Sequence, residues 1–547
     1  MAFVGYDEKS IYMNTPTICS DGYALNAAEA DFHAGDIERE VVSQISFRGL
    51  MNSAHQESGK SDLKIPYYIF SGLEPLMQWL SRWEITRRDI DDLAAERIPG
   101  TDKPLHRQDY LNYLGNPRHQ RLRIKIKARL EGGLGFPHEP LGVLTGPKWQ
   151  LDVIEAAALD LFTHHTRWAT IASQFWLAAH RVTGGRAKLY EFGLRRTPEW
   201  GGLGGSRSAY IAGWDGTSNR YASRVYGIPN VGTLPHSFIM AEPTEMAANL
   251  KWLRHMPPDI AAALPDTYAT TEGMDIHFEA CKMAGVEPRL MRIDSGDFEY
   301  LSAVAKKKAA KLGFERLTCI ASNSLDAASV FKAIRVDDAP VDAFGVGGNF
   351  VNQTQDKGEA AVMKLARVTG RYGAETKHAA RDTMKFSKGK ASYPGVQEPV
   401  HMYEEVEGEP DRFRGSVIIE EGMEIGVGGR LGHEIVSMPR GDDAVEGAYP
   451  FAAGTKYILP NVIVMEDGKP TREEFRDEDS RRITNEARTR FFGAMESLDL
   501  AHKDFLSPRL IGFGAESGLH ERQQRMILEN RLNQRRRAQG QEGAQSD

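Results

Sequence analysis

The sequence predicts an α/β fold with a central parallel sheet and an α+β outer part assembled from both ends of the chain. Three observations predict it: strict apolar–polar alternation in the N-terminal part, a repeated strand–helix order in the middle, and a return to strand-like segments beyond about residue 385. Repeated β–α order gives parallel strands, in a sheet that is either open or closed into a barrel. The length of 547 residues suits two to four domains.

The N-terminal part mixes helical and strand patterns. Residues 20–36 have a helical pattern that Ser20 or Asp21 can cap. Residues 65–83 predict a strand, a glycine turn and an amphipathic helix. The segment LRIKIKARL (122–130) alternates strictly, which predicts a half-buried strand of an antiparallel sheet.

The central part begins with a long helix predicted over 149–180, which carries a continuous apolar stripe. Short apolar runs follow, several of them separated by helical segments such as 298–313. We expect these runs to form the parallel sheet; they are KLYEF, NVGTL, AALPDTY, PRLMRI, LTCIAS and VDAFGV.

The C-terminal part becomes β-rich again in KASYPGVQEPVHMYEEV, FRGSVIIEEG and YILPNVIVME. We expect these segments to return to the first domain. The predicted division is an outer α+β domain of 16–148 with 386–510, a central part of 149–385, and a charged tail of 515–547 that is helical or disordered.

Composition excludes several classes of protein. A formal net charge of −7 and a pI of about 6.2 argue against a general nucleic-acid coat, so no nucleic-acid partner is expected. No apolar run approaches the roughly 20 residues that a membrane helix needs, and the N-terminus lacks the features of a secretory signal. The three cysteines Cys19, Cys281 and Cys319 have no metal-site spacing, which favours a reducing, cytoplasmic setting.

Each central apolar run ends in a polar or glycine-rich cluster. In α/β barrels the loops at the carboxyl ends of the strands build the active site, so we expect these clusters to converge on one pocket. Arg195, Arg196 and Arg292 offer forked donors for carboxylate or phosphate. Backbone N–H groups can approach an anion at three glycines, Gly345, Gly347 and Gly348.

Other residues of the clusters supply acceptors and a possible base. Asp294 and Asp297 can accept from sugar hydroxyls or hold Mg²⁺, and His236 can act as a base or nucleophile. Two anion sites with acceptors between them suit a sugar phosphate. Plainer interpretations stay open: the glycines can form a structural turn, the paired arginines a surface ion pair, His236 can be structural, and Asp297 can cap the helix that follows it.

The ordered set of motifs resembles the nicotinate phosphoribosyltransferase family, of the type II phosphoribosyltransferases. It covers SDGYALNAAEADF, FPHEPLGVLTGP, EFGLRR, GWDGTSN, GTLPHSF, DTY, RIDSGD, ASNSLD, FGVGGN and MKFSKGKASYPG. The resemblance implies an irregular, incomplete TIM-like α/β barrel beside a split α+β outer domain. It also implies a homodimer with active sites at the interface.

The reaction that this resemblance implies joins nicotinic acid to phosphoribosyl pyrophosphate (PRPP), with Mg²⁺. It yields nicotinate mononucleotide and pyrophosphate, a salvage step toward NAD. ATP hydrolysis is coupled to it through a phosphohistidine, which by motif position is His236. No metal-ligating residue is assigned.

The resemblance also implies roles for single residues. Phe192 would stack on the pyridine ring, with Tyr23 of the partner subunit on its other face. Arg195 and Arg292 would contact the substrate anions. Asp294 would accept from the ribose hydroxyls and Asp266 would support His236. The ribose 5-phosphate would be held by Ser322, Asn323, Gly347 and Gly348.

Ser218 of GWDGTSN favours the acid over the amide substrate. The nicotinamide-using relatives carry an Asp there, which would repel a carboxylate, whereas a Ser can donate to it. Gly348 points the other way, because acid-using enzymes often have Thr at that position, and Ala269 stands where an Asp is usual. The alternative activity is therefore nicotinamide phosphoribosyltransferase.

Two further alternatives are weaker. Quinolinate phosphoribosyltransferases are much shorter chains with a more basic pocket. An inactive homologue could act as a binding protein through its basic tail, which contains Arg522, Arg525, Arg531 and Arg535 to Arg537. A solvated helix end is the plainer interpretation of that tail.

Overall fold

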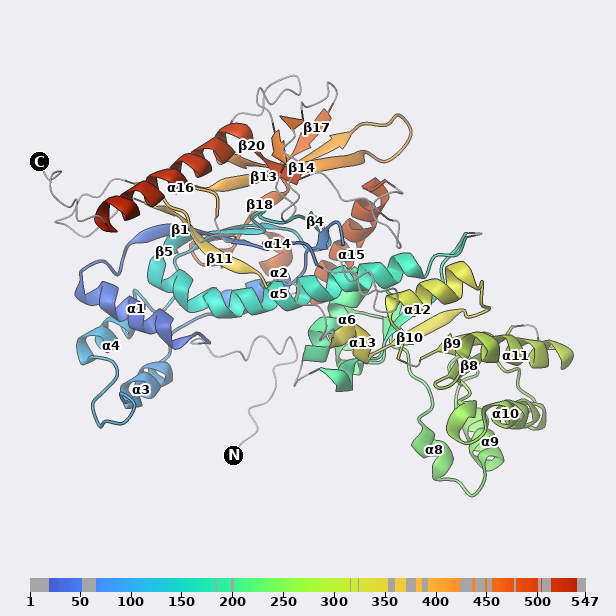
Figure 1. The fold of residues 1–547 in the computed structure, drawn as a ribbon. Coiled ribbons are helices and arrows are strands. Elements are labelled where there is room, and N and C mark those ends of the chain that lie inside the picture. Colours follow the sequence, from blue (N-terminus) through green and yellow to red (C-terminus); the bar gives the residue numbers. More distant parts are fainter. Residues whose placement is uncertain are drawn as a thin grey trace, which may run out of the picture.

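We describe the protein from a computed structural model. The residues that it describes are 19–51, 65–182, 184–197, 201–314, 316–322, 324–352, 360–369, 380–385, 392–423, 435–437, 448–449, 455–476, 479–499, 503 and 513–538. Figure 1 shows an outer β-rich part at one side, a smaller parallel sheet with its helices at the other, and the long helix α5 (Lys148–Ala178) running between them.

A seven-stranded antiparallel sheet forms the centre of the outer part. Its order is β12-β11-β1-β5-β3-β18-β19. The strands are β1 (Glu40–Ser46), β3 (Lys125–Arg129), β5 (Gly142–Pro147), β11 (Val362–Val368), β12 (Arg381–Asp382), β18 (Asn461–Glu466) and β19 (Lys469–Pro470). Strand β3 lies in the alternating segment, with Ile126 and Ala128 buried, so the predicted half-buried strand is confirmed. Strand β18 pairs with β3, so a C-terminal segment forms part of this sheet.

Strand β11 departs from the expectation for the middle of the chain. Its residues lie in the segment expected to belong to the central part, yet they pair with β1. The reason is the apolar content of VMKLARV, in which Met363, Ala366 and Val368 are buried, with an irregularity in the pairing opposite Val42 and Ser43.

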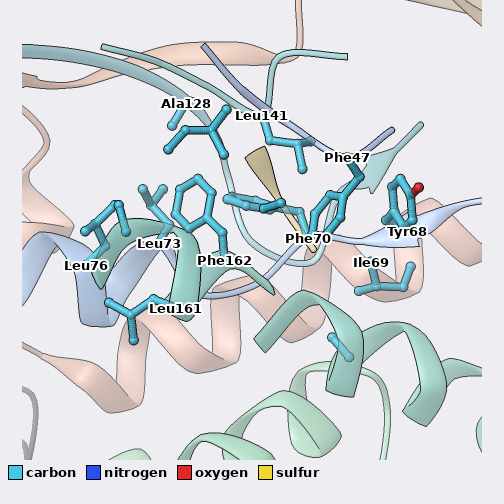
Figure 2. Packing of buried hydrophobic residues seen from close by; sticks show 14 of the residues in the cluster. Phe47, Tyr68, Ile69, Phe70, Leu73, Leu76, Ala128, Leu141, Leu161 and Phe162 are labelled. Atoms are coloured by element: carbon cyan, nitrogen blue, oxygen red, sulfur yellow. The ribbon is translucent and has the colours of Figure 1, made fainter. Parts of the chain in front are cut away.

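A hydrophobic core joins this sheet to α5. Phe162 of α5 meets Phe70 edge-on, with the ring centroids 4.9 Å apart and the rings at 83°. Figure 2 shows this pair surrounded by Leu73, Leu76 and Leu141. Aromatic side chains contribute much of the buried apolar area that stabilises such a core, and here they anchor the middle of the helix that leads to the parallel sheet.

The central part contains a five-stranded parallel sheet with the order β7-β6-β10-β9-β8. Its strands are β6 (Lys188–Glu191), β7 (Gly216–Thr217), β8 (Leu290–Ile293), β9 (Thr318–Ala321) and β10 (Ala343–Val346). Four of the six predicted runs therefore supply strands, and the mixed α/β class with a parallel sheet is confirmed.

Two predicted strands are wrong. NVGTL contributes only a bridge from Asn230 to Thr217, and AALPDTY only a bridge from Ala263 to Met291. Gly232 interrupts the first run and Pro265 the second, where a 3-10 turn begins instead. In the described part of the chain no strand pairing joins Asn230 to Ala263, so closure of the barrel stays a prediction.

A third sheet of six strands lies above the first in Figure 1. Its order is β16-β15-β20-β14-β13-β17. The strands are β13 (Gln397–Glu404), β14 (Arg412–Glu420), β15 (Ile435–Ser437), β16 (Ala448–Tyr449), β17 (Thr455–Ile458) and β20 (Phe513–Glu516). A small pair, β2 (Tyr68–Ile69) with β4 (Leu134–Gly135), completes the β structure.

Helices cover these sheets. Those of the outer part are α1 (Gly22–His33), α2 (Leu73–Leu80), α3 (Arg87–Ala95), α4 (Gln108–Leu114), α14 (Glu473–Arg476), α15 (Ser480–Ser497) and α16 (Ser517–Ala538). Those of the central part are α6 (Gly201–Ile211), α7 (Arg220–Tyr226), α8 (His236–Met240), α9 (Glu245–His255), α10 (Thr270–Ala284), α11 (Phe298–Lys311), α12 (Ala327–Phe331) and α13 (Gly348–Val351). Among the described helices, none combines the length and apolar character that crossing a bilayer requires.

Candidate active site

A cavity of about 370 Å³ lies at the carboxyl ends of the parallel strands. This is the end at which α/β proteins bind their ligands. The cavity is lined by Phe192, Arg195, Arg196, Ser218, Gly232, Thr233, Arg292, Asp294, Ser322, Ser324, Leu325, Gly345, Gly347, Gly348 and Asn349. Ten residues singled out from the sequence are therefore brought together: Phe192, Arg195, Arg196, Ser218, Arg292, Asp294, Ser322, Gly345, Gly347 and Gly348.

A hydrogen-bonded network on one wall fixes the Arg292 guanidinium. Its Nε donates to Ser322 Oγ at 2.8 Å and its Nη2 to Asp294 Oδ1 at 2.6 Å. Its Nη1 donates to Thr233 Oγ1 at 2.8 Å. Because a guanidinium has five N–H donors, these three bonds leave two for a ligand. The group is both oriented and able to bind an anion.

Asp294 is held in its ionised form by the same network. Burial raises the pKa of this carboxyl, but hydrogen bonds from Ser322 and Arg292 and the Arg292 charge outweigh burial and hold the pKa below its usual range. Ser322 Oγ donates to Oδ1 at 2.6 Å, whereas Oδ2 faces His236 Nε2 at 3.4 Å. Oδ2 is therefore the oxygen that can accept from a ligand hydroxyl.

His236 begins α8 beside this network. Its Nδ1 lies 3.0 Å from Thr267 Oγ1, and the side chain is 37% exposed. Asp266, expected to support the imidazole, accepts instead from Ser295 Oγ at 2.7 Å. The second oxygen of Asp266 has no hydrogen-bond partner among the described residues. The neighbouring Thr267 thus takes the place expected for Asp266.

Phe192 packs against the bare backbone of β10. A Cβ atom added at Gly345 would lie 2.2 Å from the Phe192 ring, and one added at Gly347 would lie 3.0 Å from Phe192 O. The aromatic ring therefore requires glycine at 345. The Arg292 Cζ lies 6.0 Å from the centroid of the same ring, a cation–π distance.

Arg195 and Arg196 lie on a 3-10 turn (Leu194–Arg196) and are exposed at the cavity. No carboxylate in the described residue ranges pairs with either one, so the surface ion pair is not found there. Arg196 extends along Gly348, its Cδ 3.7 Å from the point that a Cβ would occupy. With Asp294 as the acidic residue of the lining, three guanidinium groups make the cavity attractive to anions.

Some residues of GWDGTSN (213–219) stabilise the fold and one lines the cavity. Asp215 pairs with Arg186 at 2.9 Å, which fixes the entry to β6 and β7. Asn219 accepts from two N–H groups at the start of α7 and caps that helix. Ser218 is the side chain of this segment that lines the cavity.

The sequence does not single out two residues that the structure places at the site. Thr233, in GTLPHSF, holds Arg292. Glu191 is fully buried, although it ends a strand beside the cavity, and burial raises the pKa of its carboxyl against the opposing effect of the hydrogen bonds that it accepts. The sequence feature that could have indicated Glu191 is the position of an acidic residue at the end of the apolar run KLYEF.

Tyr23 and Asp297 are not among the residues that line the cavity. Tyr23 is 58% exposed on α1, and Figure 1 places α1 near one end of α5 and β10 near the other. Asp297 caps α11 by accepting from Tyr300 N–H at 3.0 Å, as the plainer interpretation has it. Asn323 lies outside the described residues. In the described ranges no three His, Cys, Asp or Glu side chains converge as a metal site.

Comparison with known proteins gives a consistent result. The sequence profile of the nicotinate phosphoribosyltransferase (NAPRTase) family matches residues 187–396. A nicotinate phosphoribosyltransferase of Mycobacterium tuberculosis is 30% identical over 390 residues, which cover 71% of this chain and 75% of the relative. The nicotinate phosphoribosyltransferase of Bacillus subtilis is 29% identical over 397 residues, covering 72% and 73%.

A solved structure shares the fold. The crystal structure of human nicotinic acid phosphoribosyltransferase superposes with a TM-score of 0.66 at 19% identity. The superposition covers 93% of this chain and 99% of the human chain, so it includes the outer sheets as well as the parallel one.

Proposed function

Because the chain belongs to the nicotinate phosphoribosyltransferase family, we propose that it joins nicotinic acid to PRPP and forms nicotinate mononucleotide and pyrophosphate. One observation carries the proposal: two arginines without an ion-pair partner in the described ranges, an aromatic ring and a fixed Arg–Asp–Ser network line the same cavity. A pyridine carboxylate needs a flat apolar contact and a donor, and a phosphorylated sugar needs cations and hydroxyl acceptors. One cavity offers both sets.

The pyridine would lie against Phe192. The ring of Phe192 is held from behind by the glycine backbone of β10, so its position is set before a ligand arrives. Arg195 and Ser218 line the same cavity and can donate to a carboxylate. Such a preorganised aromatic surface costs little conformational entropy on binding.

The phosphoribosyl group would lie toward the Arg292 network. Asp294 Oδ2 can accept from ribose hydroxyls, while the two unused N–H groups of Arg292 can donate to phosphate oxygens. Gly347, Gly348 and Ser322 also line the cavity and, with Asn323, would hold the 5-phosphate. These assignments rest on the family resemblance together with the distances given above.

The proposed chemistry forms the bond from the pyridine nitrogen to C1 of the ribose and breaks the bond from C1 to the pyrophosphate oxygen. Positive charge develops on the ribose ring and negative charge on the leaving group. The fixed guanidinium of Arg292 would stabilise the charge on the leaving group, and the Asp294 carboxylate would stabilise the ribose. Little proton transfer is needed.

Mg²⁺ fits this cavity as an ion that arrives with PRPP. Magnesium usually keeps several waters and binds one or two carboxylates together with substrate phosphates. Asp294 Oδ2 is the carboxylate oxygen that the described lining offers. When bound, the ion would neutralise charge on the departing pyrophosphate.

We further propose that His236 accepts a phosphoryl group from ATP. Its ring is accessible, and Thr267 at Nδ1 and Asp294 at Nε2 hold it in a defined orientation. Phosphorylation at Nε2 would place negative charge beside Asp294, whose own ionisation is favoured. The repulsion would alter the contacts of Asp294 and thereby link ATP cleavage to substrate binding.

Ser218 supports the acid as substrate, since its hydroxyl can donate to a carboxylate whereas the Asp of amide-using relatives cannot. Arg195 and Arg196, both unpaired in the described ranges, favour an anionic pyridine in the same way. Gly348 is the counter-indication carried by the sequence. The alternative activity is nicotinamide phosphoribosyltransferase.

A homodimer and a cytoplasmic setting complete the proposal. Tyr23 belongs to α1, which lies near the end of α5 opposite to β10 (Figure 1), so a stacking role at the cavity would require a second copy. The described cysteines are all unpaired, as is usual in a reducing compartment.

The direct experiment is incubation with PRPP, Mg²⁺ and nicotinate, with mass-spectrometric detection of the mononucleotide and a coupled assay for pyrophosphate. We expect the two products in equal amounts. Pyrophosphate without mononucleotide would indicate simple PRPP hydrolysis, and absence of both products would contradict the proposal.

A further inference from the structure

Glu191 is a buried carboxylate for which the proposed chemistry has no use. It is the last residue of β6 and is 0% exposed. No Arg, Lys or His of the described ranges forms an ion pair with it. A buried carboxylate without a counter-ion costs free energy unless hydrogen bonds compensate it, so its neighbours reveal its role.

The donors to this carboxylate come from three separate elements. Ser206 Oγ of α6 donates to Oε2 at 2.6 Å, and Thr217 Oγ1 of β7 donates to the same oxygen at 2.7 Å. The N–H of Gly193 donates to Oε1, and Gly193 precedes the 3-10 turn Leu194–Arg196, which we call the arginine turn. One side chain therefore joins the arginine turn, the helix α6 and the strand β7.

Each of the linked segments carries a group of the cavity wall. Phe192 lies between Glu191 and Gly193, so its backbone is fixed on both sides. Ser218 follows Thr217, and its N–H donates to the Glu191 backbone oxygen at 2.9 Å. The wall formed by Phe192 and the wall formed by Ser218 are thus held by the same residue.

We propose that Glu191 is a positioning residue that sets the distance between Phe192 and Ser218 and so determines how tightly the pyridine is bound. The inference rests on the function proposed above. It assigns to Glu191 no contact with either substrate. The Arg292–Asp294–Ser322 network is built from other strands and shares no hydrogen bond with Glu191 in the described residues, so binding of PRPP should be affected little.

Local geometry supports a role in placement. A Cβ added at Gly193 would lie 2.5 Å from Val351 and 2.7 Å from Glu191 Oε1. The chain therefore turns away from β6 through a space that only glycine fits, and the carboxylate closes that turn. An apolar residue at 191 would fill the volume at a lower desolvation cost but would leave the Gly193 N–H without its acceptor. The Ser206 and Thr217 hydroxyls would keep backbone acceptors, Gly202 O at 2.8 Å and the residue 191 O at 3.4 Å.

The test compares Glu191→Ala and Glu191→Gln with wild type. In Glu191→Ala we expect the KM for nicotinate to rise at least about tenfold, the loss expected when hydrogen bonds to a charged group are removed. The KM for PRPP should stay within about twofold. Glu191→Gln can still accept from Gly193 and donate to a hydroxyl, so it should recover most of the lost affinity.

A second variant guards against misfolding. Thr217→Val keeps the Glu191 carboxylate and the shape of its own side chain but removes one donor. We expect a smaller rise in the KM for nicotinate, and the KM for PRPP should again stay within about twofold. Glu139→Ala is the matched control: Glu139 is also a buried carboxylate, 1% exposed and paired with Arg129 in the outer part. It should lower Tm without changing the ratio of the two KM values.

Hydrogen–deuterium exchange supplies a readout independent of activity. In Glu191→Ala and Thr217→Val, amides of residues 192–196 and 216–219 should exchange faster than in wild type, whereas in Glu139→Ala they should not. Unchanged exchange there, or equal rises in both KM values, overturns the inference. If wild type makes no mononucleotide, the proposed function fails, and the exchange comparison still decides whether Glu191 fixes these segments.

Discussion

Arg292 and Asp294 form a 2.6 Å ion pair between two positions at the end of one strand. Because alternate residues of a strand face the same side, both point into the cavity. The pair uses Oδ1 of Asp294 and one N–H of Arg292, so each partner keeps capacity for a ligand. Because both side chains face the cavity, substitutions at the end of β8 should reduce activity more than substitutions elsewhere in the site.

Replacement of Arg292 should abolish most turnover. Arg292→Ala removes the fixed guanidinium, and we expect kcat to fall about 10²–10³-fold, as when a preorganised donor to a developing anion is lost. Arg292→Lys should fall between, since an ammonium lacks the planar fork. Arg289→Ala is the matched control, because Arg289 precedes the same strand and pairs with the surface Asp259. Equal kcat values for Arg292→Ala and wild type would contradict the role given to this residue.

His236 should be needed for the coupling to ATP hydrolysis and not for the ATP-independent reaction of nicotinate with PRPP. In His236→Ala we expect the ATP-independent rate to stay within about threefold of wild type while stimulation by ATP disappears. His255→Ala, at the exposed end of α9, is the control. Full stimulation by ATP in His236→Ala would show that the phosphoryl group is carried elsewhere or nowhere.

Ser218 should set the choice between acid and amide. Ser218→Asp places a carboxylate where the nicotinate carboxylate would bind, and we expect kcat/KM for nicotinate to fall at least about tenfold relative to that for nicotinamide. Ser218→Ala removes the donor without adding charge and should lower both values less. An unchanged preference in Ser218→Asp would assign the discrimination to another residue of the cavity.

Acid should destabilise the protein through buried histidines. Burial lowers the pKa of His277 from 6.5 to about 4, and its ring contacts Asn249 Oδ1 and Cys281 Sγ. Below about pH 6.5 His277 binds a proton in the unfolded chain, whereas in the folded chain it does so only below about pH 4. The free energy of unfolding therefore falls as the pH is lowered from about 6.5 to 4. The slope for one such residue is at most about 1.4 kcal/mol per pH unit.

His277→Gln should flatten that slope, which is measured by denaturant unfolding at pH 7, 6 and 5. Glu74 has the opposite tendency, because burial raises its pKa to about 7 and favours its protonated form in the folded state. Since wild type and variant share Glu74, the difference between them isolates His277. Parallel pH profiles would mean that His277 is protonated in the folded protein.

The first residues of the C-terminal helix should support the fold, and the rest should be dispensable. Leu519 is buried, and Arg522 pairs with Glu420 at 2.7 Å and with Asp382. A truncation after Glu529 removes neither residue and should leave Tm and activity unchanged. A truncation after Glu516 removes both and should lower Tm. Loss of activity on cutting after Glu529 would favour the alternative in which the tail has a function of its own.

Several features of this protein are readable from the sequence. The four runs that supply parallel strands combine apolar residues with a sharp polar end, and because parallel strands end at one edge of a sheet, Arg292, Asp294, Ser322 and Gly347 had to lie near one another. The β3 strand is equally clear, because its alternation extends over nine residues, 122–130.

Other features depend on contacts between distant residues. The role proposed for Glu191 depends on hydrogen bonds from Ser206 and Thr217, and the sequence alone does not show that these residues lie beside it. Asp215 lies in a motif that suggests ligand binding but pairs with Arg186. Thr267 replaces Asp266 beside His236 because the 3-10 turn at Pro265 decides which of two adjacent side chains faces the imidazole.

One competition experiment tests the central claim most directly. The protein is given PRPP, Mg²⁺ and equimolar nicotinate and nicotinamide, and the two mononucleotides are quantified at early times, so that their ratio equals the ratio of the kcat/KM values. We predict that nicotinate mononucleotide predominates. Predominance of nicotinamide mononucleotide, or formation of neither product, would contradict the account.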